Sequence, residues 1–352
     1  MNYIDTNMNN DDFNLYKDKG LTGLANLGNS CYINSCLQVL SHTYEFNNML
    51  KDDKFTEKLN QCSDSIILIE WNKLKNLMWS ENCTVAPYGF FRCIQEISVK
   101  KNMDMFGGFS QNDMPEFLGF MIDCFHTAIT RKVDISINGN IINETDKLAK
   151  ACFDMIKNTH SKSYSEILEL FYGVHVSLLT SIDNHDILAV TPEPFCILSL
   201  PIPNKETITL FDCLDFYCLF ERLEGDNAWY NENTNEKQAV DKVLVFWSLP
   251  KILIIDLKRF TNYNRKINNC IDIPINDVNL SKYVKGYNKE SYIYDLYGVC
   301  NHIGNCNGGH YTSFVKNANN KWYEFNDTNV NEINEANIIS EKSYCLFYRK
   351  KK

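Results

Sequence analysis

The hydrophobic positions along this chain change their period near residue 170. Before that point, apolar residues recur every three to four positions, which is typical of one buried face of an α-helix. After it, short stretches rich in β-branched and aromatic residues alternate with turn residues, which is typical of antiparallel strands. We therefore predict an α+β protein in which a helical lobe (about residues 20–165) faces a sheet lobe (about residues 166–352).

The helical lobe is expected to contain amphipathic helices joined by polar loops. One helix begins near residue 31, after a loop rich in Gly and Asn. Another has Asp113 at its N-cap and Glu116 three residues later, and Pro115 lies in its first turn, where proline is tolerated. The predicted helices cover residues 31–40, 66–78, 113–129 and 151–170, with a polar loop over residues 131–150.

The sheet lobe is expected to be built from short strands separated by turn residues. Residues 252–257 (ILIIDL) form an apolar run apart from Asp256, which indicates a central strand buried on both faces. The predicted strands cover residues 174–180, 187–190, 195–200, 240–247, 252–257, 292–299, 311–315, 321–325 and 344–349.

The composition is that of an ordinary soluble globular protein. The 352 residues are 44% apolar and 22% charged. The net charge of −9 argues against nucleic acid as the main partner and suits a basic ligand instead. The polar, Asn- and Asp-rich residues 1–19 are expected to form a mobile segment ahead of a single domain over residues 20–352.

The lack of a recognisable signal peptide and the pattern of cysteines both favour an intracellular protein. No N-terminal apolar segment resembles a signal peptide, and no apolar run approaches the ~18 residues needed to span a bilayer. The 14 cysteines show no paired spacing, so we expect reduced thiols. We expect a cytoplasmic or nuclear monomer without a membrane partner.

Cys31 has the sequence context of a cysteine nucleophile. It follows a turn-rich loop and falls in the first turn of a predicted helix, with Asn29 or Ser30 available as N-cap. The positive end of the helix dipole favours a thiolate there. Asn26, five residues earlier, is able to direct a side-chain amide at charge that develops on an attacked carbonyl.

A histidine and an asparagine near the C-terminus supply the remaining groups that a thiol nucleophile needs. His310 follows two glycines and starts a predicted strand, and Asn326 ends another strand 16 residues later. Two hairpin strands of this spacing bring the start of one opposite the end of the other, so Asn326 is placed to orient the imidazole. Asp327 is a second candidate for orienting the ring. His302 is a rival base, although it lacks the preceding glycine pair.

Four motifs in this order resemble those of the ubiquitin-specific proteases. Residues 23–38 read GLANLGNSCYINSCLQ, against the family's cysteine box GLxNLGNTCYxNSxLQ. Residues 110–117 read SQNDMPEF, which is similar to the family's QQDAxEF, and residues 257–260 read LKRF. The His box is similar in residues 308–312 (GGHYT) and 322–327 (WYEFND). The resemblance extends over residues 20–349, nearly the whole chain.

The resemblance implies a papain-like cysteine peptidase with a helical thumb, a β-sheet palm and antiparallel β fingers. The thumb is expected over residues 20–165, the fingers and the start of the palm over 166–250, and the rest of the palm over 251–352. The activity implied is hydrolysis after the C-terminal Gly-Gly of ubiquitin, through an acyl-enzyme and without a cofactor. By resemblance, Cys31, His310 and Asn326 form the triad, Asn26 holds the oxyanion, Asp327 is a possible contributor, and Gln111, Asp113, Phe260 and Tyr311 line the channel for the substrate tail.

The chain departs from the family in its fingers, where relatives often bind a structural zinc through two Cys-x-x-Cys pairs. Ser181 and Asn184 stand in place of the first pair, and residues 229–234 contain no cysteine or histidine. We therefore expect no metal site. Two alternatives for function stay open: a peptidase for another ubiquitin-like modifier, and a catalytically inactive ubiquitin-binding module.

Overall fold

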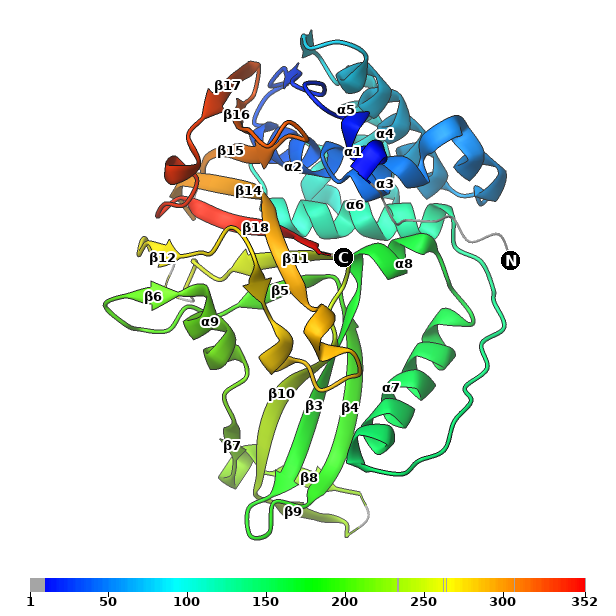
Figure 1. Ribbon diagram of the computed structural model, residues 1–352, viewed down its shortest axis with the longest axis vertical. Coiled ribbons are helices and arrows are strands. Elements are labelled where there is room, and N and C mark those ends of the chain that lie inside the picture. Colours follow the sequence, from blue (N-terminus) through cyan, green and yellow to red (C-terminus); the bar gives the residue numbers. More distant parts are fainter. Residues whose placement is uncertain (1–9, 233, 262, 264, 307, 352) are drawn as a thin grey trace.

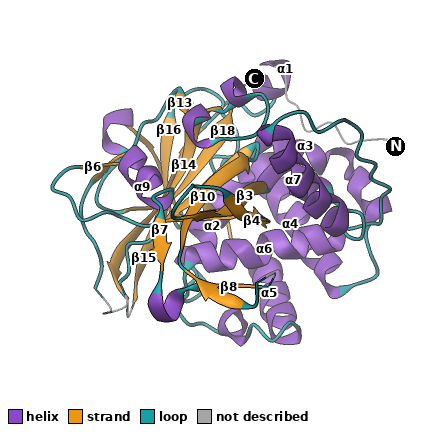
Figure 2. Ribbon diagram, turned by 90° about the horizontal axis from the view of Figure 1, so that it is seen from below, coloured by secondary structure: helices purple, strands orange, loops and turns teal. Residues whose placement is uncertain are grey.

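The computed structural model describes residues 10–351, apart from 233, 262, 264 and 307 (Figure 1). Helices gather on one side of the molecule and most strands on the other, as Figure 2 shows from below. The helices are α1 Asn10–Asn14, α2 Cys31–Ser41, α3 Tyr44–Met49, α4 Ser63–Ser80, α5 Tyr88–Lys100, α6 Met114–Ala128, α7 Glu144–His160, α8 Glu166–Phe171 and α9 Leu210–Tyr217. The 3-10 turns are η1 Lys51–Lys58, η2 Asp104–Gly107, η3 Gly225–Asn227, η4 Ser281–Tyr283, η5 Lys289–Ser291 and η6 Glu335–Asn337.

The helices predicted at residues 31–40, 66–78 and 113–129 are confirmed as α2, α4 and α6. The single helix predicted over 151–170 is wrong, because α7 begins inside the expected polar loop and α8 is a separate helix. Asn143 and Asp146 form a reciprocal capping box that starts α7. The chain therefore enters the helix at Glu144, several residues before the apolar period becomes clear.

The strands form a palm sheet and a finger sheet. The palm has the order β17-β16-β15-β14-β18-β11-β5, with β13 paired to β14, and the fingers have the order β4-β3-β10-β7. The strands are β1 Gly23–Leu24, β2 Thr84–Val85, β3 Gly173–Ser181, β4 Ile187–Phe195, β5 Ile197–Leu200, β6 Ile208–Thr209, β7 Glu221–Leu223, β8 Trp229–Asn231, β9 Glu236–Gln238, β10 Val240–Ser248, β11 Ile252–Leu257, β12 Ile271–Asp272, β13 Val278–Asn279, β14 Ile293–Asn305, β15 Gly308–Lys316, β16 Trp322–Asn326, β17 Asn329–Ile333 and β18 Ser343–Lys350.

Strand β11 is buried on both faces and paired on both sides, which confirms the buried strand predicted over residues 252–257. It pairs antiparallel with β18 and parallel with β5. Alternate residues of β11 contribute to two different cores, with Ile254 toward the helical lobe and Ile255 toward the opposite face. Helix α2 comes so close to β14 that a Cβ on Gly298 would lie 2.5 Å from the Val39 side chain. This close packing holds the C-terminal half of α2 against the palm.

The N-terminal residues that the structure describes pack against the helical lobe. Residues 1–9 of the expected mobile segment lie outside the described part. From Asn10 onward the chain forms α1, and Tyr16 stacks on Tyr44 with ring centres 4.4 Å apart. The Asp18 N–H donates to the Asn317 side chain at 3.1 Å, in the turn between β15 and β16. The segment thereby connects the helical lobe to the palm.

The finger sheet is covered on one face by α7. A core of six buried residues joins the helix to the strands, and the rings of Phe153 and Trp247 meet edge to face at 5.7 Å. Tyr287 donates to Asp146 at 2.5 Å and holds the start of α7 to the palm. Asn184 lies in the turn after β3, where it bonds Asp186. Apolar burial between α7 and the strands therefore stabilises the base of the fingers.

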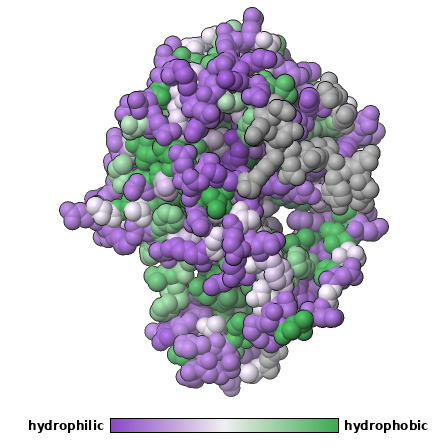
Figure 3. All heavy atoms as spheres, in the orientation of Figure 1, coloured by the Kyte–Doolittle hydropathy of each residue, from purple (hydrophilic) through white to green (hydrophobic). Residues whose placement is uncertain are grey.

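Three further properties of the described residues concern the polarity of the surface, membrane-spanning helices and clusters of metal-binding side chains. Hydrophilic residues cover most of the face in Figure 3. Within the described ranges, no helix combines the length and apolar composition that crossing a membrane requires. Among these same residues, His, Cys, Asp and Glu do not gather in groups of three or more that suit a metal ion.

We predict that the purified protein contains no stoichiometric zinc and keeps its unfolding temperature after treatment with a strong chelator. The reason is that α7, not a metal, packs the base of the fingers. Trp247→Ala is the positive control, since loss of this buried ring should lower the free energy of unfolding by about 3–5 kcal/mol. Elemental analysis with about one zinc per chain would contradict the prediction, as would unfolding on chelation.

Candidate active site

Cys31 is the first residue of α2, at the junction of the two lobes. Gly28 (φ 102°) and Asn29 (φ 52°) turn the chain just before it, in the left-handed region that glycine and asparagine tolerate. Ser30 is at the N-cap position, as expected, but its hydroxyl accepts from the Leu27 N–H at 2.8 Å and makes no capping bond to α2. The first N–H groups of α2 are thus without a side-chain cap next to the thiol.

The Cys31 thiol is buried and its pKa is raised. The residue is only 3% exposed, and burial disfavours the charged thiolate. Hydrogen bonds from the backbone of Tyr311 and Tyr32 act in the opposite direction, while the charge of Asp327 raises the pKa further. The lowered pKa predicted from the helix N-terminus is therefore wrong for this state, because desolvation outweighs the helix end. The thiol needs a base to become a nucleophile.

His310 and Asn326 meet as the hairpin spacing predicts. They lie on the neighbouring strands β15 and β16, and Nε2 of His310 is 2.8 Å from Oδ1 of Asn326. An amide oxygen only accepts, so the imidazole carries its proton on Nε2 and leaves Nδ1 as the basic nitrogen. The backbone of the next residue, Tyr311, acts to lower the pKa of the Cys31 thiol, and Ser35 of α2 donates to the Thr312 carbonyl at 3.0 Å. The structure therefore brings the predicted nucleophile, the predicted base and the amide predicted to orient it together.

Asn26 is held in one orientation by its neighbours. Its Oδ1 accepts from the N–H of Gly28 at 3.0 Å and from the N–H of Ser30 at 3.2 Å. Its Nδ2 donates to Oδ2 of Asp327 at 3.0 Å. Since an amide nitrogen has two hydrogens, the second remains for a further acceptor. Asn26 thus has the chemistry expected of an oxyanion donor.

Asp327 ties the end of β16 to the loop and helix that carry Cys31. Its other oxygen, Oδ1, accepts from Nδ2 of Asn34 in α2 at 2.8 Å, and its carbonyl accepts from the Leu24 N–H at 2.8 Å. The backbone also comes close, because a Cβ on Gly23 would lie 2.3 Å from the Thr328 carbonyl oxygen. The observed partners of the carboxylate are amides of the Cys31 segment. A direct role of Asp327 in orienting His310 stays a prediction.

His302 lies in an aromatic cluster with Phe260, Tyr311 and Tyr344. Its ring centre is 5.5 Å from Phe260, 4.7 Å from Tyr311 and 5.7 Å from Tyr344. Burial, followed by the nearby Lys266 charge, lowers the pKa of His302 to about 4. A histidine that resists protonation suits a structural role better than that of a general base. Phe260 and Tyr311, both predicted to line a channel, therefore contact the same imidazole ring.

Gln111 and Gly309 bridge the helical lobe and the palm. The Gly309 N–H donates to Oε1 of Gln111 at 2.7 Å, and Nε2 of Gln111 donates to the Gly309 carbonyl at 2.9 Å. A Cβ on Gly308 would lie 2.3 Å from the Gln111 oxygen. Glycine at position 308 thus leaves room for the Gln111 side chain, whereas a Cβ on Gly309 would lie 2.3 Å from the Ile303 carbonyl oxygen of the neighbouring strand β14.

Asp113 and Asp256 form a half-buried acidic pair. Asp113 caps α6, accepting from the Glu116 N–H at 3.2 Å, and Tyr344 donates to it at 2.5 Å. Burial raises the pKa of Asp113. Burial, reinforced by the charge of Asp113, raises the pKa of Asp256 to about 6. Ser199 donates to one oxygen of Asp256 at 3.1 Å.

Sequence reasoning assigned no role to Asn34, Tyr344 or Asp256. Asn34 and Tyr344 lie inside stretches that match the family, but their contacts join segments about 230 to 290 residues apart. Asp256 interrupts an otherwise apolar strand. A carboxylate is unusual in such an apolar run, and this was the feature of the sequence that could have drawn attention to Asp256.

A thiol at a helix N-terminus in one lobe, next to an imidazole–amide pair in the other, is the arrangement of a papain-like cysteine peptidase fold. Comparison with known proteins identifies the family within this class. The chain belongs to the ubiquitin carboxyl-terminal hydrolase family, whose profile matches residues 22–348.

Several relatives cover nearly all of this chain. It is 33% identical to ubiquitin carboxyl-terminal hydrolase Usp2 of Drosophila melanogaster over 345 residues, which is 95% of this chain and 35% of that protein. It is 30% identical to human ubiquitin carboxyl-terminal hydrolase 2 over 352 residues, 96% of this chain and 56% of the relative. The chain thus spans about a third to just over half of the length of these relatives.

The fold is also similar to a solved structure. A chain of the SAGA DUB module of Ubp8, Sgf11, Sus1 and Sgf73, bound to monoubiquitin, matches with a TM-score of 0.74 and 25% identity. The match covers 96% of this chain and 70% of that chain. The thumb, palm and fingers expected from the sequence are therefore the fold of this protein.

We predict that Asp256→Asn stabilises the protein in a pH-dependent way. The folded pKa of about 6 lies above the usual ~3.9 of the unfolded chain, so the folded state binds this proton more tightly. Stability therefore falls as the pH rises through 6 and the buried carboxyl ionises. Denaturant titrations should show a gain of about 2–3 kcal/mol for the variant near pH 7 and almost none below pH ~4.

Asp134→Asn, at an exposed position, is the control for this comparison. It should change the free energy of unfolding little at either pH. A gain for Asp256→Asn that is equal at both pH values would contradict the assignment of the effect to ionisation of Asp256.

Proposed function

We propose that this protein is a thiol-dependent deubiquitinating hydrolase that cleaves the bond after the C-terminal Gly-Gly of ubiquitin. The observation that carries the proposal is the His310–Asn326 hydrogen bond next to the buried Cys31 thiol. Membership of the ubiquitin carboxyl-terminal hydrolase family supports the reaction class. The structural relative bound to monoubiquitin supports ubiquitin as the partner.

The proposed reaction begins with proton transfer from Cys31 to Nδ1 of His310, with Asn326 holding the opposite ring nitrogen. The thiolate attacks the carbonyl carbon of the terminal glycine, and the oxyanion accepts a hydrogen bond from Asn26. His310 then gives its proton to the leaving amine, which leaves an acyl-enzyme on Cys31. Finally, His310 takes a proton from water, the hydroxide attacks the thioester, and the thiol is restored.

The narrow space between the lobes accounts for a Gly-Gly requirement. The side chain of Gln111 contacts the backbone of Gly309 directly across the lobes. A peptide that enters between them must displace or lie along this contact, and residues without side chains need the least room. Asp113, Phe260 and Tyr311 are proposed to line the same channel, where the carboxylate of Asp113 suits a basic residue of the tail.

We predict unequal losses for the triad in hydrolysis of ubiquitin with a C-terminal fluorogenic amide. Cys31→Ser should abolish turnover, and His310→Ala should lower kcat by about three orders of magnitude or more, because no other base is in place. Asn326→Ala should lower kcat less, since the imidazole itself remains. Cys306→Ser, an exposed cysteine of the same hairpin, is the matched control and should keep full activity.

Two outcomes would favour the alternatives. Turnover of another ubiquitin-like modifier without turnover of ubiquitin would assign the same chemistry to a different substrate. Ubiquitin binding without any turnover by the wild-type protein would make it an inactive binding module. Activity that survives in Cys31→Ser would overturn the proposed nucleophile.

Asp327 is proposed to act as a positioning residue through Asn26, and a double-mutant cycle tests this. Asn26→Ala should lower kcat by about 10²–10³-fold, the usual loss for one oxyanion donor. Asp327→Ala should lower kcat less, with little change in KM, because the amide remains but is less well held. The double variant should be no slower than Asn26→Ala alone.

Additive losses in this cycle would contradict the proposal and would mean that Asp327 acts through a different group. The unfolding temperature of each variant is measured alongside, so that a loss of folded protein is not counted as a loss of catalysis.

A further inference from the structure

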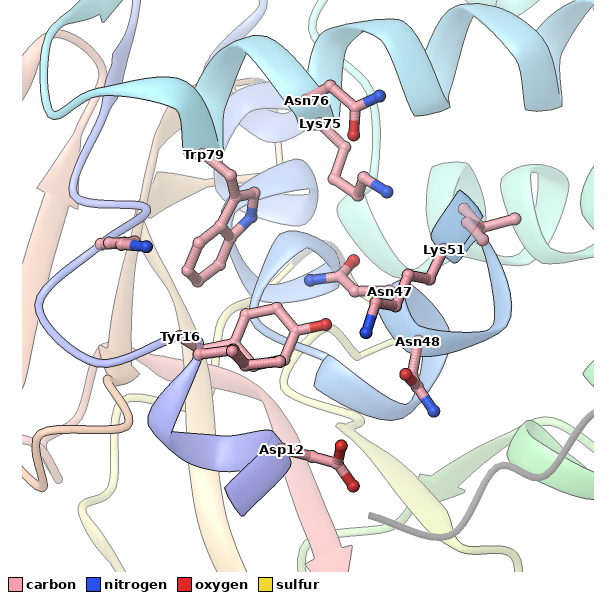
Figure 4. A pocket seen from close by; sticks show the side chains of 11 residues that line it. Asp12, Tyr16, Asn47, Asn48, Lys51, Lys75, Asn76 and Trp79 are labelled. Carbon is pink, nitrogen blue, oxygen red and sulfur yellow. The ribbon is translucent and has the colours of Figure 1, made fainter. Parts of the chain in front are cut away.

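A second pocket lies away from the thiol, on the outer side of the helical lobe. It has a volume of about 330 Å³ and is lined by the N-terminal segment around α1, by the end of α3 and by α4 (Figure 4). This size is at the lower end of the range for small-molecule sites. The hydrolase mechanism uses none of the residues that line it.

The pocket is rich in positive charge although the protein is acidic. Its described lining residues include Lys19, Lys51 and Lys75 but a single acidic residue, Asp12. The chain as a whole has a net charge of −9. Lys75 is only 7% exposed, and its ammonium donates to the Asn72 side chain at 2.8 Å. An anion bound beside a nearly buried ammonium would offset part of its desolvation cost.

Two buried polar atoms at this pocket have no hydrogen-bond partner among the described residues. One is Nε1 of Trp79, and the other is Oδ1 of Asn47, a residue that is only 3% exposed. In Figure 4 the N–H edge of the Trp79 indole faces the same space as Asn47 and Lys75. Buried polar groups are normally paired, so an unpaired donor and acceptor at one cavity point to a ligand.

Part of the pocket lining is aromatic and apolar. The rings of Tyr16 and Trp79 meet edge to face at 5.1 Å, and Leu15 and Leu50 are also among the lining residues. Burial, then the charges of Glu45 and Asp12, raises the pKa of Tyr16 to about 12, so its hydroxyl stays a donor. The pocket therefore offers both cationic and neutral donors and flat apolar surface.

We propose that this pocket binds a small phosphomonoester that carries a flat ring. The phosphate accepts from Lys51, Lys75 and the Trp79 N–H, and the ring lies against Tyr16 and the two leucines. A phosphate is favoured over an extended acidic peptide, because the pocket is small, about 330 Å³, and its lining includes two nearly buried polar residues, Lys75 and Asn47. The site is independent of the hydrolase reaction.

The test uses phenyl phosphate as the probe and isothermal titration calorimetry with the full chain. We expect one site per chain, weaker binding at higher salt, and little binding of phenol or inorganic phosphate. Lys75→Met and Lys51→Gln should each weaken binding by about tenfold or more. Trp79→Phe keeps the ring, removes the N–H donor and should weaken binding by a few-fold, about the value of one hydrogen bond.

Lys73→Gln is the matched control, since this exposed lysine lies on the same helix α4, is paired with Glu70 and does not line the pocket. It should leave the affinity unchanged. If Lys75→Met does not fold, Lys51→Gln and Trp79→Phe carry the test. Absence of binding at millimolar phenyl phosphate, equal weakening by Lys73→Gln, or preference for a glutamate-rich peptide over phenyl phosphate would each overturn the proposal.

Discussion

The arrangement of the site depends on the carboxylate of Asp327, which joins the two lobes. One oxygen accepts from Asn26 in the loop before the thiol, and the other accepts from Asn34 in the helix that the thiol begins. Asp327 has a φ of 49°, a left-handed conformation that lets the chain turn directly after Asn326. The turn that ends β16 therefore sets two things at once: the position of the group that orients His310, and the position of the segment that carries Cys31.

This junction is needed because the thiol is buried. Desolvation favours the neutral thiol, so in the proposed mechanism the reactive thiolate depends on proton transfer to a base held nearby. A base on the other lobe can accept the proton only if the two lobes are held in a fixed position relative to each other. Packing of α2 on β14 at Gly298 and the contact of Gln111 with Gly309 hold the same register from either side of the site. Several weak contacts, each ordinary on its own, thereby fix one geometry.

The sequence alone was sufficient to predict the features of the fold that depend on local residue patterns. Short stretches rich in β-branched and aromatic residues between turn residues located the palm strands, and helical spacing located α2, α4 and α6. The extent of α7 was missed, because its start depends on a capping box between Asn143 and Asp146 in a stretch that composition alone marks as a loop. The partners of Asp327 were also missed, since they lie about 300 residues away in the chain, and no local pattern specifies which amide a carboxylate meets after folding. Burial of the thiol, for the same reason, reversed the expected direction of its pKa.

The most direct measurement is the rate and position of covalent bond formation with ubiquitin that carries a C-terminal electrophile. The adduct is digested and its modified residue identified by mass spectrometry, for the wild type and for Asp327→Ala. The account predicts a bond to Cys31 in both proteins, formed more slowly in the variant while its unfolding temperature stays close to that of the wild type. A bond to another cysteine, or equal rates for the two proteins, would contradict the claim that Asp327 holds Cys31 in its reactive position.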